Sequence, residues 1–213
     1  EFILTQKLGD LGKKIHTARS RNDQVLVSIH LYLKKEISEI KSLINDFFKL
    51  LISLAKQNKD KLLPGYTHFQ VAMPSSFGLW FSAYAESLID DVTLFNAVQK
   101  IVDQNPLGSA AGFGSSFAIN RETTTKALDF GDLKYNVIAA QMSRGKAEKL
   151  ISNAIASLSA TLAKMAYDIC LYMGQDHNFI SFPQELTTGS SIMPHKKNPD
   201  VFELIRGKGN MLQ

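Results

Sequence analysis

The strongest structural signal in the chain is residues 22–58, which run NDQVLVSIHLYLKKEISEIKSLINDFFKLLISLAKQN. Their apolar residues follow one another at steps of three and four, the spacing of one face of an α-helix. A single helix of this length would extend roughly 50 Å, which is too long for the surface of a small compact domain. Such a helix suits a bundle shared between subunits, although the spacing alone also permits a coiled coil. The residues of this face are Leu26, Ile29, Leu33, Ile37, Ile40, Ile44, Phe47, Leu51 and Leu54.

Two more long helices are expected further along the chain. After a turn at residues 63–65, a helix should start near Ser75, just after Pro74. Its stripe of large apolar residues is typical of a core face rather than of a cofactor site. The third helix should run from about Lys146 to Met173, and from Ala154 onward it is apolar almost all round, as at the centre of a bundle. The residues of the stripe are Phe77, Trp80, Phe81, Tyr84 and Leu88.

The segments between these helices predict loops rather than sheet. Glycines and serines make residues 106–120 a loop, and residues 121–130 can form a short helix. No segment shows convincing period-two alternation, and no glycine-rich nucleotide motif is present. The expected fold class is therefore all-α.

Residues 189–199, GSSIMPHKKNP, gather hydroxyls, two ammonium groups and an amide on what should be a loop entering a helix. Asn198 is a good N-cap and Pro199 fits the first turn, so residues 200–212 should be helical with free N–H groups facing the loop. Anions bind readily at such helix starts. An ordinary loop with solvated lysines is the alternative, but the combination of rare residues favours a carboxylate site under a loop that can close.

This loop resembles the signature of the fumarase/aspartase superfamily, whose members eliminate an amine or water from a succinyl group to release fumarate. Residues 14–24 (KIHTARSRNDQ) and 64–70 (PGYTHFQ) resemble segments of the argininosuccinate lyase family. Residues 106–112 together with 119–122 add a fourth match. Four motifs in the family's order make chance a poor explanation.

The resemblance implies an all-α subunit with a long-helix bundle of the fumarase/aspartase type. It implies a homotetramer in which each active site draws on three subunits. On this interpretation residues 1–20 finish an N-terminal domain, and residues 21–213 belong to a central helical-bundle domain that is incomplete at its C-terminal end. The chain would then be an internal portion of a lyase.

The reaction implied by the resemblance is cleavage of argininosuccinate to arginine and fumarate, without a cofactor. Removing a proton beside a carboxylate leaves a carbanion whose charge must be met by preplaced donors and cations. By the resemblance, Ser190 transfers this proton and Lys196 stabilises the charged intermediate, whereas Ser191 is structural or a minor ligand. Because a serine hydroxyl is a poor base, Ser190 would need the nearby cations and helix start to favour its alkoxide.

His68 matches the family's active-site histidine, which exchanges a proton with the leaving nitrogen, and Glu203 matches the carboxylate that orients it. An imidazole that titrates near neutral pH suits this role. Which of Ser190 and His68 is the base and which is the acid stays open. Taken alone, a loop histidine is more often exposed or simply hydrogen-bonded, so this assignment depends on the motif.

The remaining site residues should bind the substrate. Arg21 and Asn22 would grip the succinyl carboxylate, and Asn198 would contact a carboxylate. We expect Arg144 to face the substrate. The alternative is that it is an ordinary surface arginine just before a helix. We expect Asp23 to cap the helix rather than to act in catalysis. By the resemblance, the substrate-binding set is Ser20, Arg21, Asn22, Thr67, Gln70, Arg144 and Asn198.

Composition limits the function classes. The 213 residues carry a net charge of +4, with no basic cluster interleaved with aromatics, so an acidic small substrate explains the bias as well as nucleic acid would. The single cysteine, Cys170, cannot form an intrachain disulfide. We expect its side chain to pack among apolar residues and the protein to lie in a reducing, cytoplasmic compartment. Polar residues interrupt the apolar run 154–173, which argues against a membrane span. The five histidines are scattered without a metal-binding spacing, so we expect no metal site.

Several positions depart from the family's pattern. His195 stands where argininosuccinate lyases usually carry glutamine, and a histidine there is similar to the adenylosuccinate lyase branch. Val71 and Met73 replace a commonly polar pair, and Met142 and Gly145 stand where the family tends to have serine and aspartate. These changes bear on recognition of the amine half of the substrate.

Three other functions stay open beside cleavage of argininosuccinate. An adenylosuccinate lyase-like elimination is one, but the match at residues 20–24 favours argininosuccinate. A non-catalytic crystallin-like structural protein is another, and the retained site residues argue against it. A helical interaction module would leave the polar loop motifs without a purpose.

Overall fold

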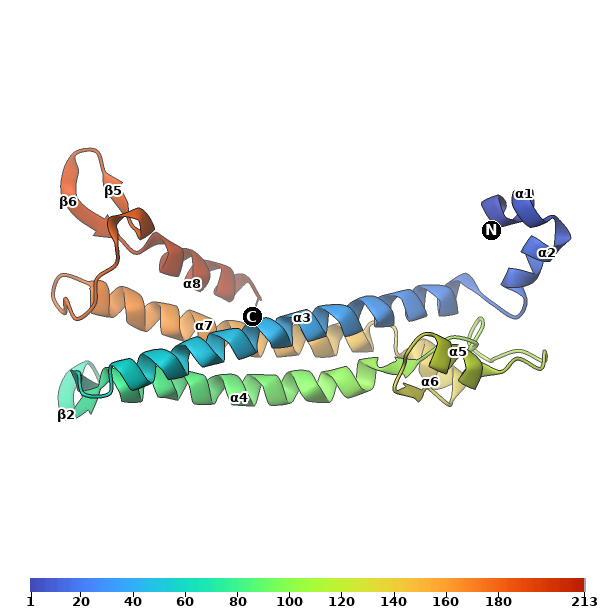
Figure 1. Ribbon diagram of the computed structural model, residues 1–213, viewed down its shortest axis with the longest axis horizontal. Coiled ribbons are helices and arrows are strands. Elements are labelled where there is room, and N and C mark those ends of the chain that lie inside the picture. The colour runs from blue at the N-terminus through green and yellow to red at the C-terminus, as the bar shows by residue number, and fades with distance from the viewer. Residues whose placement is uncertain (213) are drawn as a thin grey trace. The chain divides into compact units, whose positions relative to one another are not determined.

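The computed structural model describes residues 1–212, and most of them are helical (Figure 1). Three long helices carry the fold: α3 (Arg21–Gln57), α4 (Phe77–Val102) and α7 (Lys146–Met173). Within the described residues the only extended structure is three short two-stranded ladders. The all-α prediction is therefore confirmed, and the bounds of α7 are the predicted ones.

Helix α3 begins and ends one residue before the predicted bounds. Ser20 Oγ accepts a hydrogen bond from the N–H of Asn22 at 3.2 Å, and Asp23 Oδ1 accepts one from the N–H of Ser20 at 2.8 Å. This reciprocal arrangement satisfies N–H groups that the start of a helix leaves unpaired. The prediction that Asp23 caps the helix is confirmed.

The predicted apolar face of α3 is the face that packs. All nine of its residues are buried or half-buried, and Ile37 and Leu51 have no exposed surface. The stripe predicted on α4 behaves in the same way, since Tyr84 and Leu88 are buried and Trp80 is half-buried. Both stripes are therefore core, as their spacing predicted.

The start of α4 and the segment before it differ from the prediction. Residues 63–65 form no turn: they lie in β1 (Leu62–Thr67), which pairs antiparallel with β2 (Gln70–Ser76). Because Pro74 and Ser75 belong to this ladder, α4 starts at Phe77 rather than near Ser75. The turn of the hairpin lies instead at residues 68–69. The expectation of no strands missed this hairpin, because the apolar residues of β2 face solvent and do not alternate with polar ones.

The chain divides into two compact units, and each long helix runs through both. Unit 1 consists of residues 1–40 and 95–151, and unit 2 of residues 41–94 and 152–213. The predicted boundary between an N-terminal and a central domain after residue 20 stays a prediction.

Unit 1 holds the short elements of the chain. His30 on α3 lies 2.9 Å from the carbonyl oxygen of Val102 on α4 through its Nδ1, and Lys34 pairs with Asp103 at 2.8 Å. The helix predicted at residues 121–130 is shorter than expected. The small helices before α3 and α7 were not predicted, because the sequence there shows no helical pattern. The short elements are α1 (Phe2–Leu8), α2 (Asp10–Lys13), η1 (Lys14–His16), β3 (Gln104–Asn105), α5 (Arg121–Ala127), β4 (Asp132–Leu133) and α6 (Val137–Met142).

In unit 2, α3, α4 and α7 lie against one another. Gly78 brings α4 so close to α3 that an added Cβ would lie 2.9 Å from the carbonyl oxygen of Ala55. Asp168 on α7 accepts hydrogen bonds from Trp80 Nε1 at 3.0 Å and from the Tyr84 hydroxyl at 2.6 Å. These contacts explain why a largely apolar α7 carries an aspartate near its C-terminal end.

Helix α7 is, among residues 1–212, the one helix long and apolar enough to cross a membrane by length and composition. The core helix of a soluble bundle has the same composition, so this single helix is weak evidence for a span. Two of its serines bond to neighbouring helices: Ser157 Oγ donates to Asp91 Oδ1 at 2.7 Å, and Ser159 Oγ donates to the carbonyl oxygen of Gly209 at 3.2 Å. These bonds favour the bundle interpretation.

The segment after α7 forms a second hairpin where a flexible loop was expected. A short turn, η2 (Gln184–Leu186), leads into β5 (Thr188–Ser190), which pairs antiparallel with β6 (Met193–Asn198) before α8 (Asp200–Leu212). The assignment of Asn198 as N-cap is wrong by one residue. Asn198 pairs with Thr188 in the ladder, and the carbonyl of Pro199 accepts the first helical hydrogen bonds, from Phe202 and Glu203.

Candidate functional site

His68 lies in the turn of the first hairpin. Thr67 and Gln70 pair across the ladder, so His68 and Phe69 are the two residues of the turn. Both have positive φ, 53° and 60°. Two positive φ values are what a type I′ hairpin turn requires, and asparagine and glycine usually fill those places. His68 and Phe69 therefore adopt a backbone conformation that is less favourable for them than for asparagine or glycine. Strained backbone of this kind is typical of functional sites.

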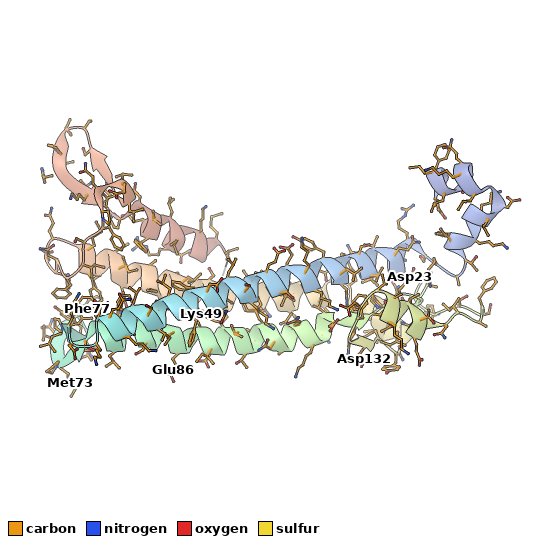
Figure 2. All side chains as sticks on the ribbon, viewed as in Figure 1. Asp23, Lys49, Met73, Phe77, Glu86 and Asp132 are labelled. Atoms are coloured by element: carbon orange, nitrogen blue, oxygen red, sulfur yellow. The ribbon has the colours of Figure 1, made fainter. Side chains whose placement is uncertain are left out.

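The hairpin presents its predicted site residues to solvent. Thr67, His68 and Gln70 are all exposed, whereas Tyr66, one residue earlier, packs its ring against His177 and Phe179. This aromatic contact anchors β1 to the segment that follows α7. The exposed face of β2 includes Met73, which lies at the outer edge of the hairpin (Figure 2).

Ser190, Lys196 and Asn198 lie on the second hairpin. Ser190 ends β5, is half-buried, and pairs with Met193 of β6. The Asn198 side-chain amide donates to Thr188 Oγ1 at 3.4 Å, which fixes the amide across the ladder. The hydroxyl of Ser190 and the amide of Asn198 therefore lie on the same short hairpin.

A cavity of about 380 Å³ lies between this hairpin and the end of α7. Lys196 and Lys197 line it, and neither has a carboxylate partner among the ion pairs of residues 1–212. Uncompensated ammonium groups beside a cavity favour an anion. The remaining lining residues are Cys170, Met173, Gly174, Gln175, His195, Asn198 and Pro199.

Cys170 does not supply a nucleophile to this cavity. Burial raises the pKa of its thiol, so the reactive thiolate is disfavoured. A raised pKa of the Cys170 thiol agrees with the packing role expected from the sequence. The polar chemistry of the cavity therefore comes from β6 rather than from α7.

The other candidate residues belong to unit 1. Ser20 is half-buried at the start of α3, and Arg21 and Asn22 are exposed in its first turn. Arg144 is exposed just before α7, and its Nε lies 3.3 Å from Glu148 Oε1, one turn further on. A surface ion pair of this kind is weak, so a substrate carboxylate could replace it.

Within unit 2, only part of the predicted constellation comes together. Lys196 and Asn198 share the wall of one cavity, but Ser190 is not part of that wall. Glu203 is exposed in the first turn of α8. Among the residues described, no hydrogen bond or ion pair joins His68 to Ser190, Lys196 or Glu203, and the two hairpins stand apart (Figure 1). A complete catalytic set is therefore not formed within this unit.

Two features of the site were missed by sequence reasoning. Thr188 holds the amide of Asn198 and carried no signal beyond its place in a small-residue stretch. Asp23 has a second oxygen that bonds to the loop after β3, a contact between residues 85 positions apart that no local pattern predicts.

A family model described as lyase matches residues 1–212. The chain belongs to this lyase family. The lyase resemblance drawn from its four motifs is thereby confirmed over essentially the whole chain.

Curated relatives extend the match. The chain is 58% identical to argininosuccinate lyase of Parabacteroides distasonis over 213 residues, and 55% identical to that of Bacteroides fragilis. It is 44% identical to argininosuccinate lyase of Stenotrophomonas maltophilia over 206 residues, or 97% of this chain. In each case the match covers 48% of the relative. The chain thus spans about half the length of the curated relatives it matches.

Solved structures agree on the fold. A crystal structure of EDDS lyase in complex with formate matches 98% of this chain and 42% of that one, with a TM-score of 0.93 and 24% identity. A class II fumarase from Schistosoma mansoni matches 92% of this chain and 46% of its own, with a TM-score of 0.77 and 19% identity. At these identities the likeness shows the fold alone.

Proposed function

We propose that this lyase-family chain contributes to cleavage of argininosuccinate into arginine and fumarate. The observation that carries the proposal is the 58% identity to a curated argininosuccinate lyase along all 213 residues. The cavity beside Lys196 and Asn198 supports it, because a substrate with several carboxylates needs cations and amide donors of this kind.

In the proposed reaction, the alkoxide of Ser190 takes the proton from the carbon beside a succinyl carboxylate. The electron pair delocalises into that carboxylate, and Lys196 and Asn198 stabilise the added charge. The pair then forms the double bond of fumarate as the carbon–nitrogen bond breaks. Ser190 pairs with β6, a strand that carries two lysines, and nearby cations favour the alkoxide over the neutral hydroxyl.

The leaving nitrogen becomes the guanidinium nitrogen of arginine and needs a proton. We assign its delivery to His68, oriented by Glu203, because an imidazole donates protons readily near neutral pH. Thr67 and Gln70, which flank the turn, would hold the substrate beside it. Ser20, Arg21, Asn22 and Arg144 would bind its carboxylates.

The site residues are proposed to complete one another between subunits. Among the described residues of unit 2, no hydrogen bond or ion pair joins His68 to Ser190 or Glu203, although the mechanism needs them around one substrate. A homotetramer in which each active site collects residues from different subunits would bring them together. Exposed apolar residues on the long helices, such as Leu43 on α3 and Leu79 on α4, support such an assembly.

Single variants of the full-length protein test this proposal. Ser190→Ala should lose at least a hundredfold of the rate of fumarate formation, whereas Ser191→Ala, its neighbour in the turn, should keep the wild-type rate. Equal rates in the two variants would remove Ser190 from the mechanism.

Mixing two inactive variants tests the shared site. If Ser190 and His68 act from different subunits, Ser190→Ala and His68→Asn subunits reassembled together should restore activity at roughly a quarter of the sites. If both residues acted from one subunit, no site in the mixture would be intact and activity would stay at the level of the single variants.

One residue, His195, favours an alternative candidate substrate. His195 lines the cavity beside Lys196 and Asn198, and a histidine at this position is similar to the adenylosuccinate lyase branch. Adenylosuccinate is therefore the competing substrate, and a direct comparison of fumarate release from the two substrates separates them.

A further inference from the structure

Asp23 has more hydrogen bonds than a helix cap requires. It has no exposed surface, and its Oδ1 accepts the N–H of Ser20 at 2.8 Å. Its Oδ2 accepts two further hydrogen bonds, from the N–H of Gly108 at 3.0 Å and from that of Ala110 at 3.1 Å. Figure 2 shows Asp23 near the start of α3. One buried carboxylate thus joins the start of α3 to a loop that lies 85 residues later in the chain.

The loop is shaped to meet this carboxylate. Gly108 and Ala110 both have positive φ, 89° and 52°, which allows their two N–H groups to converge on one oxygen. A side chain at position 108 is excluded, since an added Cβ would lie 2.8 Å from Arg121 Cγ. Positive φ at alanine is unfavourable and persists only where surrounding contacts enforce it.

Two other side chains hold the same loop from its far side. Gln141 on α6 donates from Nε2 to Ser109 Oγ at 2.8 Å and to the carbonyl oxygen of Ala110 at 2.9 Å. Arg121 on α5 donates from Nε to the carbonyl oxygen of Leu107 at 2.9 Å. The loop is therefore fixed between Asp23 and α6, the helix that precedes Arg144.

We infer that Asp23 is a positioning residue for the proposed carboxylate-binding segment Ser20–Asn22. By fixing the N–H of Ser20 and the 108–110 loop at once, it sets the direction in which Arg21 and Asn22 leave the helix start. Gln141 secures the other side of the loop and so supports the same placement. This inference rests on the proposed function, because it concerns the residues that would bind the succinyl carboxylate.

A simple cap would behave differently. Capping uses only Oδ1, and its loss lowers the amount of folded protein without changing how the remaining molecules bind substrate. A positioning residue changes the Michaelis constant for argininosuccinate, KM, and the affinity for fumarate in molecules that are folded. The two roles are therefore separable by binding constants measured on folded protein.

The test uses Asp23→Asn in the full-length protein, with Asp91→Asn as the matched control. Asparagine keeps the size of Asp23 but turns an amide N–H₂ toward donors, so one of the two links is lost. We expect KM and the inhibition constant for fumarate to rise about ten- to a hundredfold. Asp91 is equally a buried aspartate and accepts a hydrogen bond from Ser157, which is not a candidate site residue. Its variant should keep the wild-type constants.

Fumarate binding to the protein, measured by calorimetry, gives a readout that does not depend on turnover. Wild-type KM and fumarate affinity in folded Asp23→Asn would overturn the inference. If that variant does not fold, Gln141→Leu decides: a several-fold rise in KM supports the inference, and a wild-type KM contradicts it. Failure of the wild-type protein to cleave argininosuccinate would instead count against the proposed function.

Discussion

Thr67 and Gln70 pair directly across the first hairpin, which leaves His68 as the first residue of a two-residue turn with positive φ. Asparagine tolerates this conformation better than histidine does. His68→Asn should therefore keep the hairpin and the free energy of unfolding, and lose about a hundredfold or more of the rate of fumarate formation. Steady-state kinetics with chemical denaturation separates the two effects, and a large fall in stability would contradict the turn assignment.

Phe69 provides the matched variant for that turn. It also has positive φ and is exposed, so Phe69→Gly removes backbone strain without opening a cavity. We expect the free energy of unfolding to rise by about 1 kcal/mol and the rate of fumarate formation to stay at the wild-type level. A loss of stability in Phe69→Gly would show that the ring packs against a partner.

Asp168 should be critical for the contact between α4 and α7. Its removal in Asp168→Ala leaves the Trp80 N–H and the Tyr84 hydroxyl without their acceptor, which should lower the free energy of unfolding by about 1–3 kcal/mol. Lys164→Ala, exposed on the same helix, should change it by less than about 0.5 kcal/mol. Equal effects in the two variants, measured by urea denaturation, would show that the three groups form no stabilising cluster.

Gly207 and Gly209 on α8 should respond with opposite signs. An added Cβ at Gly209 would lie 2.9 Å from Ala163 Cβ, whereas at Gly207 it meets nothing within 4 Å. Gly209→Ala should cost about 1–3 kcal/mol through overpacking, and Gly207→Ala should gain about 0.5–1 kcal/mol from helix propensity. Thermal unfolding of the two variants checks this, and a stabilising Gly209→Ala would mean that α8 does not pack on α7 in solution.

His30 should make the stability of the protein depend on pH. Burial lowers its pKa from the ordinary value of 6.5, opposed by the carbonyls of Val102 and Gln104 and by Glu148, and aided by Lys134. A lowered pKa in the folded state means that the stabilisation is present above pH 6.5 and is lost as the pH falls. Denaturation at several pH values should show a steeper loss below pH 6.5 in the wild type than in His30→Gln. Identical slopes would contradict the burial of a neutral imidazole.

The long helices could be predicted because each has a local cause. The three-and-four spacing from Leu26 to Leu54 fixes both the helix and its packed face, and the apolar run 154–173 marks most of α7. The hairpins could not be predicted in this way. Their strands are mostly exposed, so they lack an apolar alternation, and the His68–Phe69 turn lacks the asparagine and glycine that signal such a turn.

The candidate site, too, could be predicted only in part from the sequence. Motif resemblance names Ser190, Lys196 and His68, but each lies in a short element whose position depends on contacts far away in sequence. The hydrogen bond that Asp23 accepts from the N–H of Gly108, and the one that Gln141 donates to the carbonyl oxygen of Ala110, are long-range contacts of this kind. The one-residue error at Asn198 has a similar origin, because ladder pairing with Thr188 extends the strand into the expected cap.

The most direct test of the proposed function is fumarate release by the full-length protein, followed by ultraviolet absorbance, with argininosuccinate and adenylosuccinate supplied separately. We predict release from argininosuccinate, with a kcat/KM far above that for adenylosuccinate. A preference for adenylosuccinate, or no release from either substrate, would contradict the proposed function.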